Sequence, residues 1–345
     1  MVTFGTIMAP RNHPDRPRPL PEIYSEYISD AVHLEQLGFE FAWIGEHRMT
    51  PCQWTPSPLT MAAAMAARTS VLRVGTSVLC LPFHNPLRVA EDIAVIDNIS
   101  GGRFDFGFGV GSHWDEFATF GVPIERRWSI TMESAQLIER CLTDTGPFDH
   151  HGDYFTFTGI RFTTKPVQRP LPFWVGGTGA KTVDLAAGRG WHLMAHRPAR
   201  YDQRLEANGR NPAEYFAAPM QMVCIAPTHD EAVESSLEGL HYFRNFYALR
   251  RQPDGSVPDP ATAEVTREMI RQGDLGGFGP PVVGTPDEAY ELLAPLMTTP
   301  GVTHLPLSFR HAGMRTPEVR QSMDLFAAEV LPALRALEAT PAGKP

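Results

Sequence analysis

The chain is poor in cysteine and has no long apolar run, and each absence excludes a class of protein. Its four cysteines are far apart, without CxxC spacing, at Cys52, Cys80, Cys141 and Cys224. Zinc sites and disulfide frameworks need cysteines in closer sets, so we expect free thiols, a reducing compartment and no metal. No run of about 18 apolar residues is present, and the first residues lack the pattern of a signal peptide. The sequence therefore predicts a soluble, cytoplasmic protein without a membrane span.

Basic charge is also scarce. Lysine and arginine number 30 against 39 acidic residues, which gives a formal net charge of −9 and a pI near 5.8. Nucleic acids and anionic membranes are bound by basic patches, so neither is an expected partner. The 345 residues, 43% of them hydrophobic, can bury a large core in one α/β domain or two smaller ones.

The clearest local pattern lies in residues 72–111. An apolar run at 72–81 is followed by a helical stretch at 86–99 and a second apolar run at 103–108, which ends in alternating glycines. Neither run alternates with polar residues, as is typical of strands covered on both faces of a parallel sheet. The pattern predicts a strand–helix–strand unit whose last strand leaves bare backbone at its carboxyl end, where such sheets bind ligands.

Similar units repeat along the chain. The other predicted strands lie at 2–8, 39–44, 171–175, 191–195, 220–225 and 302–307, and the other predicted helices at 22–37, 58–69, 125–143, 183–189, 199–209, 230–249, 266–272, 286–296 and 316–337. Eight strands without a linker favour a single (β/α)8 TIM barrel over 1–345, rather than a doubly wound sheet. Residues 147–163 predict an inserted hairpin, and residues 112–120 a loop. Long loops are expected at the carboxyl-terminal face, with a mobile insertion at 250–280 that includes a glycine-rich turn.

Residues 176–182 form a glycine-rich turn between a predicted strand and a predicted helix. Free backbone N–H groups and the helix dipole favour a phosphate there, although a tight turn is the alternative. The segment lacks the GxxxxGK[ST] pattern of a P-loop. Residues 107–111 read GxGxG and run into a polar, aromatic segment, so the dinucleotide fingerprint is not met.

Histidines fall at several predicted strand ends. Glu46 and His47 lie at the mouth of the predicted barrel, where strand ends line the site. The other histidines at strand ends, none of them diagnostic, are His84, His113 and His196. His150 and His151 are adjacent on a strand and point to opposite faces, so they do not predict a metal site.

Longer blocks of the sequence resemble the bacterial luciferase-like flavin monooxygenases, whose relatives include deazaflavin-dependent reductases. The blocks are LGFEFAWIGEH at 37–47, VGTSVLCLPFHNPLRVAEDIAVIDNISGGRFDFGFGVG at 74–111, PLPFWVGGTG at 170–179 and GTPDEAYELL at 284–293. The resemblance runs over almost the whole chain. The resemblance implies a (β/α)8 barrel with a flavin at the carboxyl ends of the strands.

The resemblance also implies roles for single residues. His47 matches the family's active-site histidine, which makes it the expected catalytic acid or base. The Ser77-Val78 bond falls where the family has a non-prolyl cis peptide beneath the flavin. The expected cofactor-binding residues are Ser77, Val78, Gly109, Gly177, Thr178, Gly179, Ala180 and Lys181. The expected substrate-pocket residues are Met8, Trp54, His113 and Trp114, although packing on the barrel rim is the alternative for the aromatic ones.

The chain departs from luciferase itself at Gly109 and Val110. Luciferase has a reactive cysteine and a phosphate-contacting arginine there, so the resemblance does not extend to light emission from a long-chain aldehyde. The phosphate then needs another cation. The candidates are Lys181 and the pair Arg126 and Arg127.

The function that the resemblance implies is that of a two-component monooxygenase. Reduced FMN, supplied by a separate NAD(P)H:flavin reductase, binds in the barrel and adds molecular oxygen to give a peroxyflavin, which oxygenates a small, mostly apolar organic substrate. The family also implies a homodimer. The alternatives are a deazaflavin-dependent oxidoreductase that moves a hydride, and a non-catalytic flavin-binding subunit. The sequence does not identify the substrate.

Overall fold

A curled parallel sheet forms the centre of the computed structural model, which describes residues 2–252, 254–273 and 280–339. The strands run in the order β11-β10-β12-β1-β2-β3-β5-β8-β9, with the short β4 beside β5. Their bounds are β1 Thr3–Met8, β2 Phe41–Ile44, β3 Arg73–Thr76, β4 Leu79–Cys80, β5 Phe104–Gly109, β8 Phe173–Gly176, β9 His192–Met194, β10 Gln221–Ile225, β11 Val282–Gly284 and β12 His304–Ser308. Each of the eight predicted strands is present, the run at 72–81 as the two strands β3 and β4, and β11 is an additional one.

The two sides of the curl meet at a short segment before β10. Leu193 of β9 donates to the Phe216 carbonyl over 3.0 Å, and Ala218 donates back to Leu193 over 3.0 Å. The backbone N–H of His304, at the start of β12, donates to the carbonyl of Ala217 over 3.2 Å. This segment therefore links β9 to β12 across the curl.

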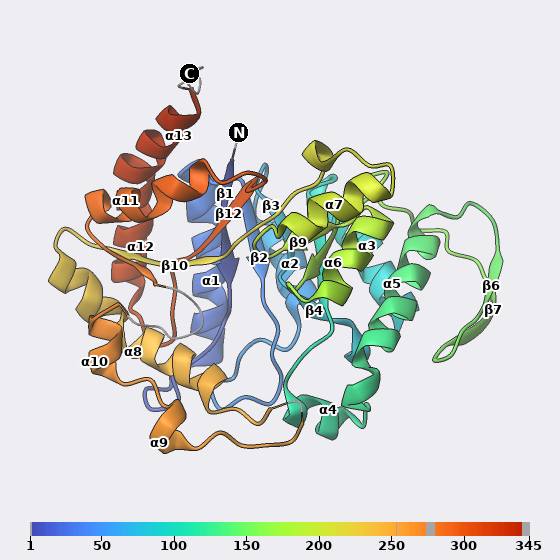
Figure 1. Cartoon of the computed structure of the whole chain (residues 1–345), viewed down its shortest axis with the longest axis horizontal. Helices are drawn as coiled ribbons and strands as arrows, with labels where there is room; N and C mark the ends of the chain where they lie inside the picture. The colour runs from blue at the N-terminus through green and yellow to red at the C-terminus, as the bar shows by residue number, and fades with distance from the viewer. Residues whose placement is uncertain (1, 253, 274–279, 340–345) are drawn as a thin grey trace.

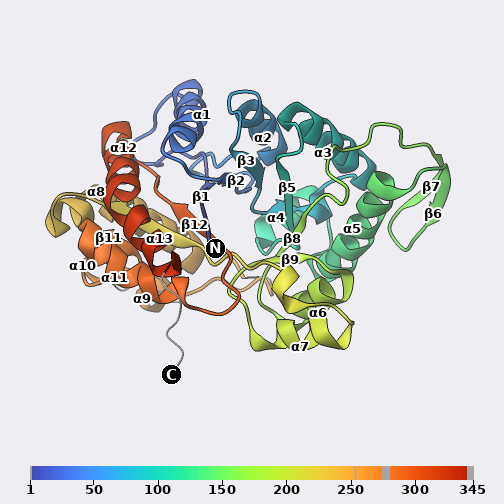
Figure 2. The same cartoon turned by 90° about the horizontal axis from the view of Figure 1, so that it is seen from above.

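Helices surround the sheet, as Figure 2 shows from above. They are α1 Leu20–Gln36, α2 Pro58–Ala66, α3 Pro86–Ser100, α4 Trp114–Phe120, α5 Arg127–Thr143, α6 Ala180–Arg189, α7 Ala199–Ala207, α8 His229–Ala248, α9 Pro260–Ala263, α10 Arg267–Arg271, α11 Pro286–Met297, α12 Thr316–Leu325 and α13 Leu331–Ala339. Helix α3 illustrates the local signals: Asn85 caps its first turn, Pro86 opens it, and Gly101 ends it in a left-handed conformation with φ 67°. No helix of the described residues has the length and apolar character needed to cross a membrane.

The predicted loop at 112–120 is wrong for most of its length, because Trp114–Phe120 forms helix α4. Asp115 and Glu116 lie in its first turn, where the helix dipole favours acidic groups, and Gly121 ends it with φ 66°. The hairpin of β6 (Phe148–His151) and β7 (Thr156–Ile160) is antiparallel and projects away from the sheet (Figure 1). The predicted insertion at 250–280 contains α9 and α10, and most of its glycine-rich turn lies outside the described residues.

Aromatic side chains fill the inside of the curl below the site. Phe41 and Trp43, two residues apart on β2, are fully buried and stack at 4.2 Å, and Trp174 of β8 lies 5.0 Å from Trp43. The Trp43 indole donates to Asp105 over 3.0 Å. Gly75 makes room for this layer, because a Cβ there would lie 2.7 Å from the Trp43 ring. The layer closes the curl, so the carboxyl ends of the strands form the open side.

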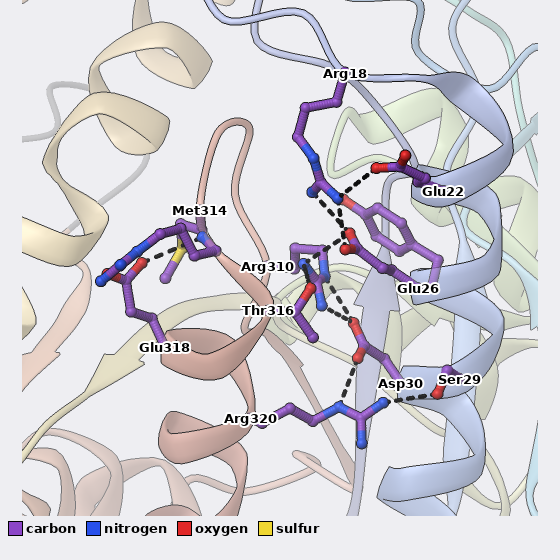
Figure 3. A network of polar contacts seen from close by, with 12 residues as sticks. Arg18, Glu22, Glu26, Ser29, Asp30, Arg310, Met314, Thr316, Glu318 and Arg320 are labelled. Atoms are coloured by element: carbon purple, nitrogen blue, oxygen red, sulfur yellow. Dashed lines mark hydrogen bonds and ion pairs between the residues drawn. The ribbon is translucent and has the colours of Figure 1, made fainter.

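A buried polar network holds α1 against the segment that follows β12 (Figure 3). Asp30 of α1 is 1% exposed and accepts from Arg310 over 2.6 Å and from Arg320 over 2.9 Å. Glu26, one turn earlier, binds Arg18 at 2.7 Å and lies 3.5 Å from Arg310. The network therefore fixes the loop that continues from Arg310 to the site.

Candidate active site

A cavity of about 570 Å³ opens at the carboxyl ends of the strands. Much of its lining comes from residues that follow six parallel strands, β1, β2, β3, β5, β8 and β12, and further side chains come from β9, β10, α4 and α8. Its volume is typical of sites that bind a cofactor or a small substrate. The side chains that do chemistry therefore converge here from distant parts of the chain.

One wall of the cavity is made by the residues after β3, β5 and β8. The peptide bond between Ser77 and Val78 is cis, as the resemblance predicts, and both residues line the cavity. Gly109 and Gly176 line it beside Val78, and an added Cβ would lie 2.7 Å and 2.8 Å from the valine methyl groups. A side chain at either position would require the Val78 side chain to move. The result is a wall of bare backbone and one valine, which suits a flat ring system.

The predicted phosphate turn lies next to this wall. Gly177 lines the cavity and has φ 121°, a conformation that favours glycine. Gly179 precedes Ala180, the first residue of α6, and no side chain caps that helix, so its first N–H groups can bind an anion. Thr178 and Lys181 are exposed beside them. Arg127 donates to the carbonyl of Ile124 over 2.7 Å, and Arg126 is exposed in the preceding turn.

His47 lies at the end of β2, between two hydrogen-bond partners. Its Nδ1 is 3.1 Å from Glu116 Oε1 and its Nε2 is 2.9 Å from the Tyr247 hydroxyl. A carboxylate only accepts, so Nδ1 carries the proton and Nε2 accepts from the tyrosine. Burial raises the pKa of Tyr247 to about 12, so its hydroxyl stays protonated. This arrangement fixes the ring and leaves His47 able to take or give a proton at Nε2.

Glu116 and His113 complete the surroundings of His47. Glu116 is 4% exposed and also accepts the backbone N–H of Arg48 over 2.9 Å. The His113 ring lies 4.3 Å from that of His47, and burial lowers the His113 pKa to about 2, so it is neutral. His47, His113 and Glu116 offer ligand atoms that all lie within 4.8 Å of one another. This group could hold a metal ion, which the sequence did not predict.

Glu46 has a different role from its neighbour His47. Its buried carboxylate pairs with Arg48, lies 3.2 Å from His84 Nε2 and accepts the Cys80 N–H over 2.6 Å. Burial, reinforced by the Arg48 charge, lowers the pKa of His84 to about 4. Glu46 therefore connects the end of β2 to β4, and His84 is part of the same group of contacts.

Of the other residues predicted to form the pocket, some line the cavity and others do not. Trp54 lines the cavity, with its ring 4.5 Å from that of His47. Met8 packs in the main core and Trp114 lies under the guanidinium of Arg251, and neither is among the described residues that line the cavity. His196 is exposed beside a neighbouring hollow.

Several residues that line the cavity are not among those that the sequence predicts. Arg11 lies in a segment rich in proline and arginine, and Glu116 lies in the segment predicted as a loop. Phe243 and Tyr247 face the cavity from α8, where their spacing of four residues was available as a helical pattern. His311 lies beyond the last predicted strand.

Comparison with known proteins places the chain in a family. The model of the luciferase-like monooxygenases matches residues 2–304. The chain belongs to that family, and the family implies an oxidoreductase.

The relatives with an assigned reaction are distant. The chain is 25% identical to 4-hydroxyprotoasukamycin monooxygenase of Streptomyces nodosus subsp. asukaensis, over 96% of this chain and 92% of that one. It is 26% identical to limonene 1,2-monooxygenase of Rhodococcus erythropolis, over 96% and 86%. A third match, 28% identical over 50% of this chain and 48% of the other, is to the oxygenase component of flavin-dependent trigonelline monooxygenase of Acinetobacter baylyi.

Solved structures share the fold. The monooxygenase RslO1 from Streptomyces bottropensis superposes with a TM-score of 0.82 and 25% identity, over 96% of this chain and 99% of that one. An F420-dependent secondary alcohol dehydrogenase superposes with a TM-score of 0.73 and 20% identity, over 97% and 99%. The same fold thus occurs in a monooxygenase and in an F420-dependent dehydrogenase.

Proposed function

We propose that the protein is the oxygenase component of a two-component flavin monooxygenase. In this proposal reduced FMN comes from a separate NAD(P)H:flavin reductase, and molecular oxygen and a small organic substrate are consumed. We further infer that the curled sheet is the (β/α)8 barrel of the family, that residues 1–345 form a single domain, and that the protein works as a homodimer in the cytoplasm. The four cysteines are free and buried, which supports a reducing compartment.

The observation that carries the proposal is the position of His47. Glu116 and Tyr247 hold its ring at the cavity. The glycine and valine wall is formed by the residues at the ends of β3, β5 and β8, the strands that follow β2 in the sheet. The described residues fit a flavin: the wall leaves space for a flat ring system, and the uncapped α6 can accept a phosphate. When bound, the flavin supplies the reaction with oxygen.

The residues of the chain then divide the remaining work. Ser77, Val78, Gly109 and Gly176 orient the ring, and the turn from Gly177 to Lys181 binds the phosphate. His47 holds or moves a proton at Nε2, with Glu116 fixing its tautomer. Trp54, Phe243 and Met222 give the cavity apolar walls that exclude water from the reacting atoms.

The second candidate is a deazaflavin-dependent oxidoreductase. The F420-dependent dehydrogenase with the same fold favours it, although at 20% identity that likeness concerns the fold. A hydride transfer would use the same cavity and would not consume oxygen. A non-catalytic flavin-binding subunit would not need the Glu116–His47–Tyr247 arrangement.

Titration under anaerobic conditions distinguishes these candidates. The protein is titrated with reduced FMN and separately with reduced deazaflavin, air is admitted, and the absorbance and hydrogen peroxide are followed. We expect FMN to bind and its reoxidation to show a slow phase that free FMN lacks. Binding of deazaflavin alone would favour the second candidate, and binding of neither would contradict both.

His47 is tested in the same assay. His47→Ala should shorten the slow phase and release more peroxide, because the group that manages the proton is lost. A matched surface variant, His229→Ala on the exposed start of α8, should behave as the unmodified protein. Unchanged peroxide release in His47→Ala would remove His47 from this role.

A further inference from the structure

Arg11 is a buried cation that lines the cavity. It follows β1, is 4% exposed and lines the cavity. Its Nε and Nη1 have no hydrogen-bond partner among the described residues. Of the described residues that line the cavity, it is the single arginine or lysine. Burial of an unpaired guanidinium is costly, so its retention here calls for an explanation.

The backbone around Arg11 is held in place. The Tyr27 hydroxyl donates to the carbonyl of Ala9 over 2.8 Å, and the N–H of Thr55 donates to the carbonyl of Pro10 over 2.8 Å. The N–H of Asn12 donates to the Cys52 carbonyl over 2.7 Å. The backbone at Arg11 is therefore ordered before any ligand binds. The free energy of ligand binding is then not reduced by the cost of ordering this segment.

Two aromatic rings lie against the guanidinium of Arg11. Its guanidinium carbon lies 4.3 Å from the centre of the Trp54 ring and 5.1 Å from that of Phe243. Ring faces attract the cation but do not accept its N–H groups in the guanidinium plane. The two carboxylates that line the cavity are already bound, Glu46 by Arg48 and His84, and Glu116 by His47 and the Arg48 N–H. No carboxylate of the described residues pairs with Arg11.

Arg11 also lies on the side of His47 that is away from the glycine and valine wall. In the sheet, β2 separates β1, which leads to Arg11, from β3, which leads to the cis peptide. Trp54 lies within 4.5 Å of both the His47 ring and the Arg11 guanidinium, by ring centre. A molecule that reacts beside His47 and extends past Trp54 would bring its far end to Arg11.

We propose that the substrate carries a carboxylate that binds Arg11, while its apolar body lies against Trp54 and Phe243. This inference rests on the proposed function and refines the expectation of a mostly apolar substrate. Guanidinium and carboxylate form paired, charge-assisted hydrogen bonds, which the unpartnered N–H groups of Arg11 are free to make. Arg11 is then a specificity-determining residue that selects anionic over neutral molecules.

Matched pairs of probes test the proposal by calorimetry on the full chain, with and without oxidised FMN. The pairs are cinnamate with cinnamamide and benzoate with benzamide, which differ in charge and hardly in shape. We expect the carboxylate to bind about tenfold tighter or more than its amide, as a charge-assisted hydrogen bond gives. Arg11→Met should abolish this preference and Arg11→Lys should keep part of it. Arg88→Met, which removes the same charge from the exposed side of α3, should keep all of it.

Two results would overturn the proposal: equal binding of both members of each pair by the unmodified protein, or a carboxylate preference that persists in Arg11→Met. Thermal melts establish that each variant is folded. FMN binding is measured on the same samples. A protein that prefers carboxylates but does not bind FMN would contradict the proposed function alone, and one that binds FMN without the preference would contradict this inference alone.

Discussion

Asp30→Asn should destabilise the protein strongly, because it breaks the network that joins α1 to the loop after β12. Asp30 is 1% exposed and binds Arg310, itself 7% exposed, and Arg320. Removing one partner of a buried ion pair costs about 3–5 kcal/mol. Unfolding entropy of about 2.1 cal/mol/K per residue over 345 residues makes each kcal/mol worth about 1.4 °C, so the melting temperature should fall by about 4–7 °C.

The matched control is Asp184→Asn. Asp184 also binds two arginines, Arg200 and Arg204, but on the surface, where ion pairs contribute little. Calorimetry of both variants at neutral pH measures the difference. Equal shifts in the two variants, or no shift in Asp30→Asn, would refute the reasoning that burial makes this network stabilising.

Three further predictions concern the cavity and the buried histidines. Gly109→Ala should weaken FMN binding at least about tenfold, since its Cβ would lie 2.7 Å from the cis-linked valine, whereas Gly146→Ala, with open space around it, should not. Burial lowers the pKa of His304 from 6.5 to about 3, so its neutral form stabilises the fold fully above pH 6.5 and this contribution is lost as the pH falls toward 3. The melting temperature should fall over that range, and less steeply in His304→Gln. Chelators should leave flavin binding unchanged, while Zn²⁺ should bind at His47 and His113 and inhibit, and His113→Gln should remove that sensitivity.

The sequence predicts the fold well where local signals and burial agree. Helix α3 has a capping asparagine, an opening proline and a closing glycine, and its predicted bounds differ from the observed ones by one residue. Helix α4 was predicted as a loop, because seven residues with several aromatics show no long helical period. Its acidic first turn was the available signal.

The site was predictable only in part, for a physical reason. His47, the cis peptide and the turn proposed to bind phosphate lie in blocks that resemble the family, so the sequence indicates them directly. Glu116, Tyr247 and Arg11 act through contacts between distant segments: Tyr247 meets a histidine 200 positions away. No local period or motif encodes such a contact, and only the folded chain reveals it.

Arg310 and His311 are adjacent in the chain but have different surroundings. Arg310 is bound into the network of Figure 3, while His311 lines the cavity. In laboratory evolution of this protein, the residues around the cavity should therefore differ in how well they tolerate substitution. Changes in the loop after β12 would disturb the anchor on α1 and lose folded protein, whereas Phe243 faces the cavity from α8. Libraries aimed at a new substrate belong at Phe243, and not at Arg310 or at Tyr247, which holds the His47 ring.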